Sequence, residues 1–278
     1  MTIVFCFSLL PILAWGGGGW PQPKGKGYYK LGQNWIIASS FYSPSGDIID
    51  IRTTSLFTTS FYGEYGITDR LTGIAYLPFF VRGTLNEIRY NQSGTIIPGD
   101  EVNAIGDVDI ALKYGIIKDK PVVLSATLSL GIPLGVTAGG RGKILQTGDG
   151  EFNQMIRFDV SHSFYPAPVY VSFYAGFNNR TNNFSDEFRY GGEIGYTFFK
   201  KLTTIVKLNV VESLYNGDDQ VAENNGIFSN NTEYFSPTLE IGYQLNDRWG
   251  FSASGGFAAS GRNILASPNW GVGLFLKI

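Results

Sequence analysis

The chain has 278 residues, of which 44% are hydrophobic and 16% charged, and its formal net charge is −2. Apolar content of this order supports an extensive folded structure, which excludes an intrinsically disordered protein. The near-neutral charge, without a basic cluster, excludes the electrostatic signature of a nucleic-acid-binding protein, so we expect no nucleic-acid partner.

The chain begins with an apolar run at residues 2–13, TIVFCFSLLPIL, followed by the small residues of AWGGGG. The run is too short for a transmembrane helix and has the length of a signal-peptide core. We therefore interpret residues 1–18 as a signal peptide and residues 19–278 as the folded domain. The only cysteine, Cys6, lies in this run, so the processed chain would have neither a disulfide nor a cysteine metal site. No motif in the sequence indicates a cofactor or a metal.

Residues 19–27, GWPQPKGKG, are rich in Gly, Pro and Lys. Such a segment is either a plain linker or a plug that folds into the interior of the following domain. The plug hypothesis rests on Trp20, an aromatic anchor among flexible glycines. Both alternatives stay open at this stage.

From about residue 28 onward, apolar residues alternate with polar or charged ones, a period of two that predicts β-strands. The strands are separated by two kinds of joint that alternate along the chain. The short joints have turn chemistry or charge, and they lie at residues 68–70, 118–121, 165–168, 200–201 and 246–248. The long joints are rich in Asn, Ser, Gly and Asp, and they cover roughly residues 43–52, 85–105, 135–150, 178–186, 214–232 and 260–268.

Six long joints that alternate with five short ones predict about 12 strands in an up-and-down meander, with both chain ends on the side of the short turns. An even strand count, short turns at one end and long loops at the other are typical of barrels in bacterial outer membranes. Most strands have about ten residues or more, which is enough to cross a bilayer at a steep tilt. The predicted fold class is all-β, a transmembrane up-and-down antiparallel β-barrel.

The distribution of charge predicts which face of each strand meets lipid. In residues 106–115, GDVDIALKYG, the residues Asp107, Asp109 and Lys113 share one face, and the other face is entirely apolar. The same division recurs at residues 187–199 and 233–245, whereas residues 29–42 and 71–82 are nearly apolar on both faces. Because a Lys or Arg on the lipid face at mid-depth costs about 2 to 4 kcal/mol, the charged faces should point into the barrel.

The predicted interior charges have both signs, and they are Glu64, Lys113, Arg157, Asp159, Arg189, Glu193, Lys207 and Glu240. One interpretation is a lumen whose charges select a solute, and the other is a salt-bridged interior that only fills the barrel. Barrels of eight strands are filled by side chains, and barrels of sixteen leave a channel, so twelve strands decide for neither interpretation.

The C-terminal segment NWGVGLFLKI places Trp270, Val272, Leu274, Leu276 and Ile278 on one face and then stops. This pattern resembles the assembly signal that closes many bacterial barrels. The expected partners are therefore the barrel assembly machinery, outer-membrane lipid with its lipopolysaccharide, and a small-molecule solute.

The only histidine, His162, is the candidate residue for an enzymatic function. A serine–histidine site needs both side chains on one face, and the flanking Ser161 and Ser163 point to the opposite face. The outward position two residues later is Phe164, and the short turn at 165–168 follows. We interpret His162 as an interfacial residue, find no catalytic cluster in the sequence and predict that the protein is not an enzyme.

Three segments carry a family resemblance: IGDVDIALKYGI at residues 105–116, SATLSLGIPLG at 125–135 and LQTGDGEFNQMIRFDVSHSF at 145–164. The Gly-Asp strand start, the Gly-x-Pro-x-Gly strand end and the Thr-Gly-x-Gly before the next strand recur in this order. Over residues 50–278 the chain thus resembles the bacterial outer-membrane family of MetA-pathway phenol-degradation proteins, relatives in architecture of the long-chain fatty-acid channels. The family has no agreed catalytic or binding residues that could be transferred to this chain.

The resemblance implies a bacterial outer-membrane location and passive or facilitated transport of small molecules, with hydrophobic or aromatic compounds as candidates. The alternative is a sealed structural or surface-binding barrel that acts through long outer loops such as residues 85–105 and 214–232. The discriminating property is whether the barrel interior is open or closed.

Overall fold

The computed structural model describes residues 18–218 and 228–278, so that the predicted signal peptide lies outside the described residues except for its last position. Within these ranges every regular element is a β-strand. No helix in the described chain is long and apolar enough to cross a membrane.

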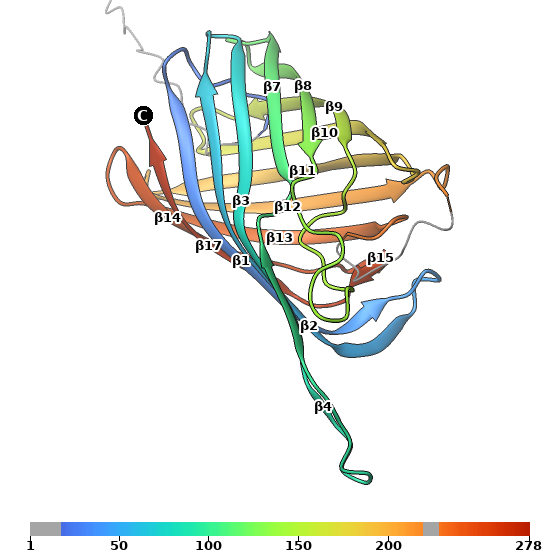
Figure 1. The fold of residues 1–278 in the computed structure, drawn as a ribbon. Coiled ribbons are helices and arrows are strands. Elements are labelled where there is room, and N and C mark those ends of the chain that lie inside the picture. Colours follow the sequence, from blue (N-terminus) through green and yellow to red (C-terminus); the bar gives the residue numbers. More distant parts are fainter. Residues whose placement is uncertain (1–17, 219–227) are drawn as a thin grey trace, which may run out of the picture.

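Twelve long strands form a closed antiparallel barrel (Figure 1). Each strand pairs with the one before it and the one after it, and the first pairs with the last along residues 28–36 and 269–277, which closes the cylinder. The predicted fold class is thereby confirmed. The twelve strands are β1 (Gly27–Tyr42), β2 (Ile48–Gly66), β3 (Leu71–Leu85), β7 (Val108–Ile117), β8 (Val122–Ile132), β9 (Asn153–Ser163), β10 (Val169–Arg180), β11 (Glu187–Phe198), β12 (Leu202–Ser213), β13 (Glu233–Gln244), β14 (Trp249–Gly256) and β17 (Asn269–Lys277).

Five short strands complete the sheet or leave it. β6 (Asp100–Ala104) extends the line of β7 along β3, β15 (Ser260–Arg262) extends β14 along β13, and β16 (Ile264–Leu265) extends β17 along β1. β4 (Ile88–Arg89) and β5 (Ile96–Ile97) pair with each other in a hairpin that projects away from the barrel (Figure 1).

The two ends of the barrel differ as the sequence predicts. The five short turns lie at one end together with the barrel's first and last strand residues, where Gly27 N donates to Ile278 O at 3.2 Å. We call this the short-turn end and the opposite one the long-loop end. At the long-loop end several residues that were predicted to be loop belong to strands, and these are residues 48–52, 100–104, 178–180, 260–262 and 264–265. Residues 100–104, 178–180 and 260–262 are polar, because strand segments beyond the apolar outer band no longer need apolar side chains. Residues 48–52 and 264–265 contain Ile and Leu, but they follow turn-forming residues such as Ser45, Gly46 and Asn263.

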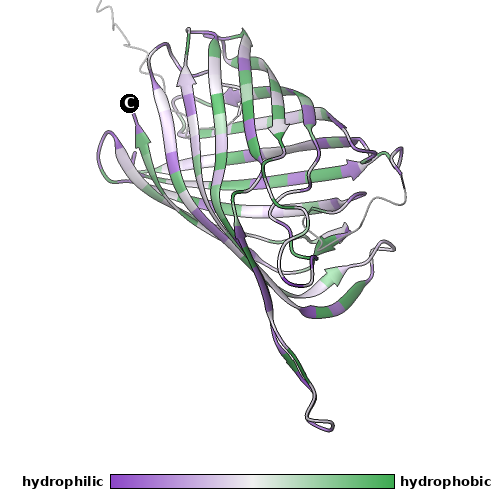
Figure 2. Ribbon diagram, in the orientation of Figure 1, coloured by the Kyte–Doolittle hydropathy of each residue, from purple (hydrophilic) through white to green (hydrophobic). Residues whose placement is uncertain are grey.

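The predicted division into an apolar outer face and a polar inner face is confirmed. In β7 the side chain of Leu112 is 50% exposed on the outer surface, whereas its neighbour Lys113 is 5% exposed in the interior. Along β11, Phe188 and Ile194 are exposed, and along β13 Leu239 and Ile241 are exposed. Figure 2 shows the resulting alternation of hydrophobic and hydrophilic residues along the strands.

The last two strands separate at the long-loop end. β14 pairs with β17 as far as Gly256 and Asn269, and beyond this point β15 stays on β13 while β16 stays on β1. Asn263 joins the two branches and donates from Nδ2 to Asn231 O at 3.2 Å. In the described chain, no backbone pairing connects β15 with β16.

The barrel interior as candidate functional site

Residues 18–22 lie inside the short-turn end of the barrel, and residues 23–25 follow them to the exposed rim, where Lys24 N donates to Asp69 Oδ1 at 3.1 Å. Lys113 on β7 donates from Nζ to Gly18 O at 2.9 Å, and Gly19 N donates to Ser161 Oγ on β9 at 2.8 Å. Gly19 packs so closely on β9 that a Cβ at this position would lie 3.0 Å from Asp159 O. β7 and β9 therefore bind the first two described residues of this segment.

The following residues of this segment contact three more strands. Gln22 donates from its backbone N to Thr72 Oγ1 at 2.8 Å and from Nε2 to Glu64 Oε2 at 2.9 Å. Trp20 stands edge-on to Tyr170 on β10, with ring centroids 5.6 Å apart. The segment thus contacts β2, β3, β7, β9 and β10.

Aromatic and aliphatic side chains fill the remaining part of the short-turn end. Tyr28, Ile205 and Phe275 form a buried cluster, and the rings of Tyr28 and Phe275 stack at 5.6 Å. Tyr62 packs against this cluster and hydrogen-bonds to Glu64. The cluster and the beginning of the 18–25 segment both occupy the barrel interior just inside the short turns.

On the side of the aromatic cluster that faces the long-loop end, charged side chains of β1, β13, β12 and β11 form a series of ion pairs. Lys30 and Lys207 both donate to Glu240, at 2.9 and 2.7 Å, and Lys207 lies 4.0 Å from Glu193. Tyr170 OH donates to Glu193 at 3.0 Å. A cavity of about 320 Å³ borders this group and is lined by Lys30, Lys207 and Glu240.

Two further ion pairs lie at the middle of the barrel. Arg157 on β9 donates from Nε to Asp159 Oδ1 at 3.0 Å, and its guanidinium lies 3.9 Å from the ring centroid of Tyr174. Arg189 on β11 donates from Nε to Glu187 Oε2 at 2.8 Å. Each arginine is thus fixed by a carboxylate two residues away on its own strand.

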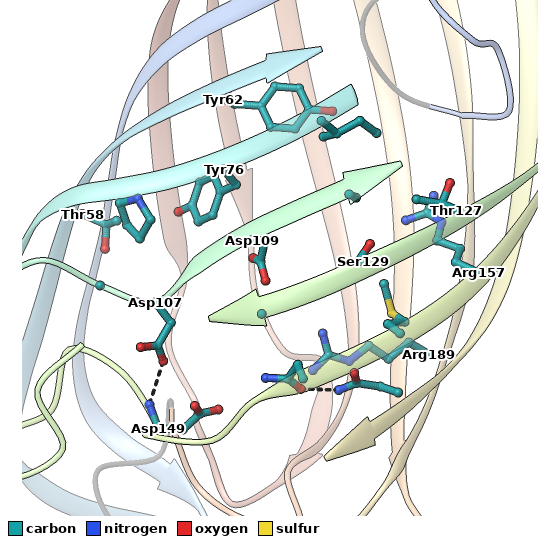
Figure 3. A pocket seen from close by; sticks show the side chains of 18 of the residues that line it. Thr58, Tyr62, Tyr76, Asp107, Asp109, Thr127, Ser129, Asp149, Arg157 and Arg189 are labelled. Carbon is teal, nitrogen blue, oxygen red and sulfur yellow. Dashed lines mark hydrogen bonds between the residues drawn. The ribbon is translucent and has the colours of Figure 1, made fainter. Parts of the chain in front are cut away.

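A cavity of about 620 Å³ extends along the interior from residues 18–25 to the long-loop end. Gly18 and Lys113 line its inner end, and Asp107 and Asp149 line its mouth. Figure 3 shows Thr58, Tyr62 and Tyr76 on one side of it and Arg157 and Arg189 on the other. The interior therefore holds a polar space that extends from Gly18 to the loops at the opposite end.

The mouth is shaped by residues 133–152, which fold back on the barrel. Asp107, between β6 and β7, accepts from Gly135 N at 2.8 Å and from Asp149 N at 2.9 Å (Figure 3), so it binds both ends of this loop. Burial, with a contribution from the neighbouring Asp149 carboxylate, raises the pKa of Asp107 to about 6, although the two amides oppose the shift. Burial also raises the pKa of Glu151, against the opposing charge of Arg180.

The structure places all eight predicted interior charges inside the barrel, but in separate groups. Lys113 and Glu64 bind residues 18–25, Arg157 pairs with Asp159, and Lys207 lies with Glu193 and Glu240. Arg189 instead pairs with Glu187, which the prediction did not include. Lys30, Glu151 and Arg180 are also interior residues, and the sequence prediction missed them. Of the three, only Lys30 lies in a segment that was predicted to be a strand, where a charged side chain is expected to face the interior.

His162 lies on the outer face of β9 beside the short turn, as predicted. Its Nδ1 lies 2.6 Å from Pro121 O, and its ring stands edge-on to Phe164 at 4.5 Å. Ser161, by contrast, points inward and shares a hydrogen bond of 2.7 Å with Ser172. The geometry thus separates this histidine from the neighbouring serine hydroxyl.

Comparison with known proteins gives a likeness of fold. No family model and no curated protein sequence matches the chain, so the resemblance to the phenol-degradation family rests on its short motifs alone. Among solved structures, the COG4313 outer membrane channel from Pseudomonas putida F1 is similar with a TM-score of 0.61 and 11% identity, over 94% of this chain and 98% of that one.

Two other solved barrels are similar over comparable lengths. The NanC porin has a TM-score of 0.54 and 8% identity, with 90% of this chain and 100% of that chain covered. The translocator domain of the autotransporter NalP from Neisseria meningitidis has a TM-score of 0.54 and 10% identity, with 92% and 90% covered. The chain therefore has the fold of twelve-stranded outer-membrane β-barrels.

Proposed function

We propose that the protein is a channel of the bacterial outer membrane through which small molecules pass, and that residues 18–25 are a plug that closes its short-turn end. In this proposal Gly18 belongs to the mature chain, so that the signal peptide ends at residue 17. The observation that carries the proposal is the cavity of about 620 Å³ that leads from the mouth to Gly18. A barrel packed only for stability would fill this space with side chains.

The outer surface supports the membrane location. Exposed Leu, Ile, Phe and Tyr side chains surround the barrel, and a contiguous apolar surface of this extent does not remain in water on a monomeric protein. In this proposal the band contacts lipid and lipopolysaccharide, and β17 presents Trp270 and Val272 outward to the barrel assembly machinery. The long-loop end faces the outside of the cell, as in other barrels of this class.

The hydrogen bonds of residues 18–25 support the role of a plug. A plain linker would be solvated, whereas this segment binds buried groups on five strands, among them Lys113 and Glu64. These bonds are polar, and water can replace them when the segment leaves. Withdrawal of the plug therefore exposes little apolar surface beyond that of the Trp20–Tyr170 contact.

The test is the single-channel conductance of the purified protein in planar bilayers, compared with a variant that lacks residues 18–24. We expect a low conductance for the intact protein and a several-fold larger one for the variant, because the deletion opens the short-turn end. The matched control lacks an equal number of residues, 89–95, from the projecting β4–β5 hairpin and should conduct like the intact protein.

Two results would contradict parts of the proposal. An unchanged conductance after removal of residues 18–24 would refute the plug. If neither the intact protein nor the variant conducts ions or admits small solutes into liposomes, permeation itself is wrong. The alternative of a sealed barrel that acts through its outer loops would then hold.

A further inference from the structure

A second interior cavity, of about 610 Å³, lies beside the first and is bordered by residues of β1, β9, β11 and β13. Among the described residues that line it, only Arg157 and Arg189 carry a charge. We call it the arginine cavity. The same two arginines also line the adjoining first cavity, where Asp107, Asp109 and Asp149 add negative charge.

The two arginines stand at the same height in the barrel wall. Arg157 and Arg189 both pair in register with Gly176, from opposite sides of β10. At the usual strand spacing their Cα atoms are about 9 to 10 Å apart, and the long side chains can reach one common ligand. Gly176 has no side chain between them, and a Cβ there would lie 3.2 Å from Arg157 Cβ.

In both ion pairs the arginine side chain is partly exposed, whereas the carboxylate side chain is buried. The side chains of Arg157 and Arg189 are 31% and 39% exposed, whereas those of Asp159 and Glu187 are 1% and 3% exposed. A guanidinium has five N–H donors in a planar fork, and both arginines contact their carboxylates through Nε and Nη2. The two N–H groups of Nη1 take no part in these contacts, and both arginines line the cavity.

The other walls of the arginine cavity are apolar, aromatic or neutral. Tyr174 and Tyr234 present ring surfaces, and Leu56, Met155 and Leu265 add aliphatic and thioether surface. A volume of this size, with mostly apolar walls and a few convergent polar groups, is typical of sites for small organic ligands. A strongly hydrated inorganic anion would gain nothing from these walls.

We infer that the arginine cavity binds a small organic acid, whose carboxylate lies between Arg157 and Arg189 and whose apolar body packs against Tyr174 and Tyr234. Arginine recognises carboxylates through paired N–H donors, which gives both affinity and orientation. The inference deepens the proposed channel function, on which it rests in one respect: the bound acid is the class of solute that the channel would carry.

The test is isothermal titration of the purified full-length barrel in detergent with benzoate as the probe. Three related compounds separate the contributions: benzyl alcohol lacks the charge, benzylammonium reverses it, and acetate lacks the apolar body. We expect benzoate to bind at least tenfold more tightly than each of the three, a difference of about 1.4 kcal/mol.

The decisive variant is Arg189→Met, because Glu187 then keeps its ion pair with Arg180 at 2.8 Å and the fold loses no buried partner. It should weaken benzoate binding at least tenfold. A second variant, Arg157→Met with Asp159→Asn, removes the other pair without leaving a buried charge and should have a similar effect. The matched control is Lys207→Met, which removes an interior cation outside the arginine cavity while Lys30 still pairs with Glu240; its benzoate affinity should stay within twofold.

The results separate this inference from the proposed function. Equal benzoate affinity in Arg189→Met and in the unmodified protein would overturn the site, as would equal binding of benzyl alcohol or benzylammonium. The titration is done without a membrane, so it is independent of the conductance measurement. If benzoate binding depends on Arg189 but the barrel never conducts, the binding site is supported and permeation is refuted.

Discussion

Arg180, the last residue of β10, holds the long-loop end together. It donates to Glu151 at 2.7 Å, to Glu187 at 2.8 Å and to Asp149 at 3.1 Å, and thereby connects the loop 133–152 with β11. The side chain of Glu151 is fully buried and depends on Arg180 and the amide of Thr181. A buried charge network of this kind contributes little when intact, but losing one partner is costly.

At the residue scale we therefore predict that Arg180→Met destabilises the barrel by about 3 to 5 kcal/mol, because Glu151 is left as a buried and uncompensated carboxylate. The measurement is the midpoint of urea unfolding in lipid vesicles, followed by tryptophan fluorescence. Adding Glu151→Gln should restore part of the loss. A loss below about 1 kcal/mol in the single variant would show that water reaches Glu151 and that the network carries little of the fold's stability.

Residues inside regular strands could be assigned to the interior from the sequence, and residues near the loops could not. Lys113 and Arg157 follow the parity of their strands, so their orientation was predictable. Arg180, Asp149 and Glu151 lie in or beside segments that read as loops, where no periodicity relates a residue to a face. The partners of each charge were also beyond prediction, since pairing depends on the register of neighbouring strands.

At the scale of the elements, β3 shows why two strands had no predictable faces. The register between β2 and β3 shifts at Ser60, which stands opposite both Pro78 and Phe79, so that β3 carries one extra residue there. Pro78 has no N–H for the ladder, and strands accommodate proline at such bulges. Phe79 and Phe80 are consequently both exposed on the outer surface. A simple alternation cannot describe a strand whose parity changes in the middle.

The regular strand β8 offers a matched test of the two faces. Leu128 is 53% exposed on the outer surface, and its neighbour Ser129 lines the first interior cavity. We expect Leu128→Lys to destabilise the barrel in lipid vesicles by about 2 to 4 kcal/mol, because the ammonium would lie at mid-depth in hydrocarbon. Ser129→Lys should cost less than about 1 kcal/mol, since its side chain meets a polar space. Equal costs for both variants would contradict the assignment of faces.

At the scale of the whole molecule, the cylinder follows from the order of its joints. Short and long connections that alternate strictly leave few topologies other than a meander. The first and last strands of a meander have unpaired backbone N–H and C=O groups, and closure of the barrel pairs them with each other. The path of residues 18–25 into the interior could be stated only as an alternative, because nothing in a short Gly- and Pro-rich segment encodes its distant partners. Its contacts with β9 and β10 involve residues about 140 to 150 positions away.

The orientation of the molecule in the cell envelope can be tested with two insertions of the same epitope tag. A tag after Gly94, in the projecting β4–β5 hairpin, should be bound by antibody on intact cells. A tag after Lys120, in the short turn between β7 and β8, should be bound only after the outer membrane is permeabilised. Both sites are exposed turns that tolerate insertion. The opposite labelling pattern would reverse the proposed direction of the channel.

The parting of β15 from β16 gives the barrel wall a seam. Where two of the twelve long strands pair, widening the cylinder means breaking a ladder of backbone hydrogen bonds. At the seam the two branches are joined through the turn at Asn263 and the side chains around it, so they can spread or close at much lower cost. Ala258, Leu265 and Ser267 on these branches also line the arginine cavity. This side of the cavity can therefore widen without the loss of a strand ladder.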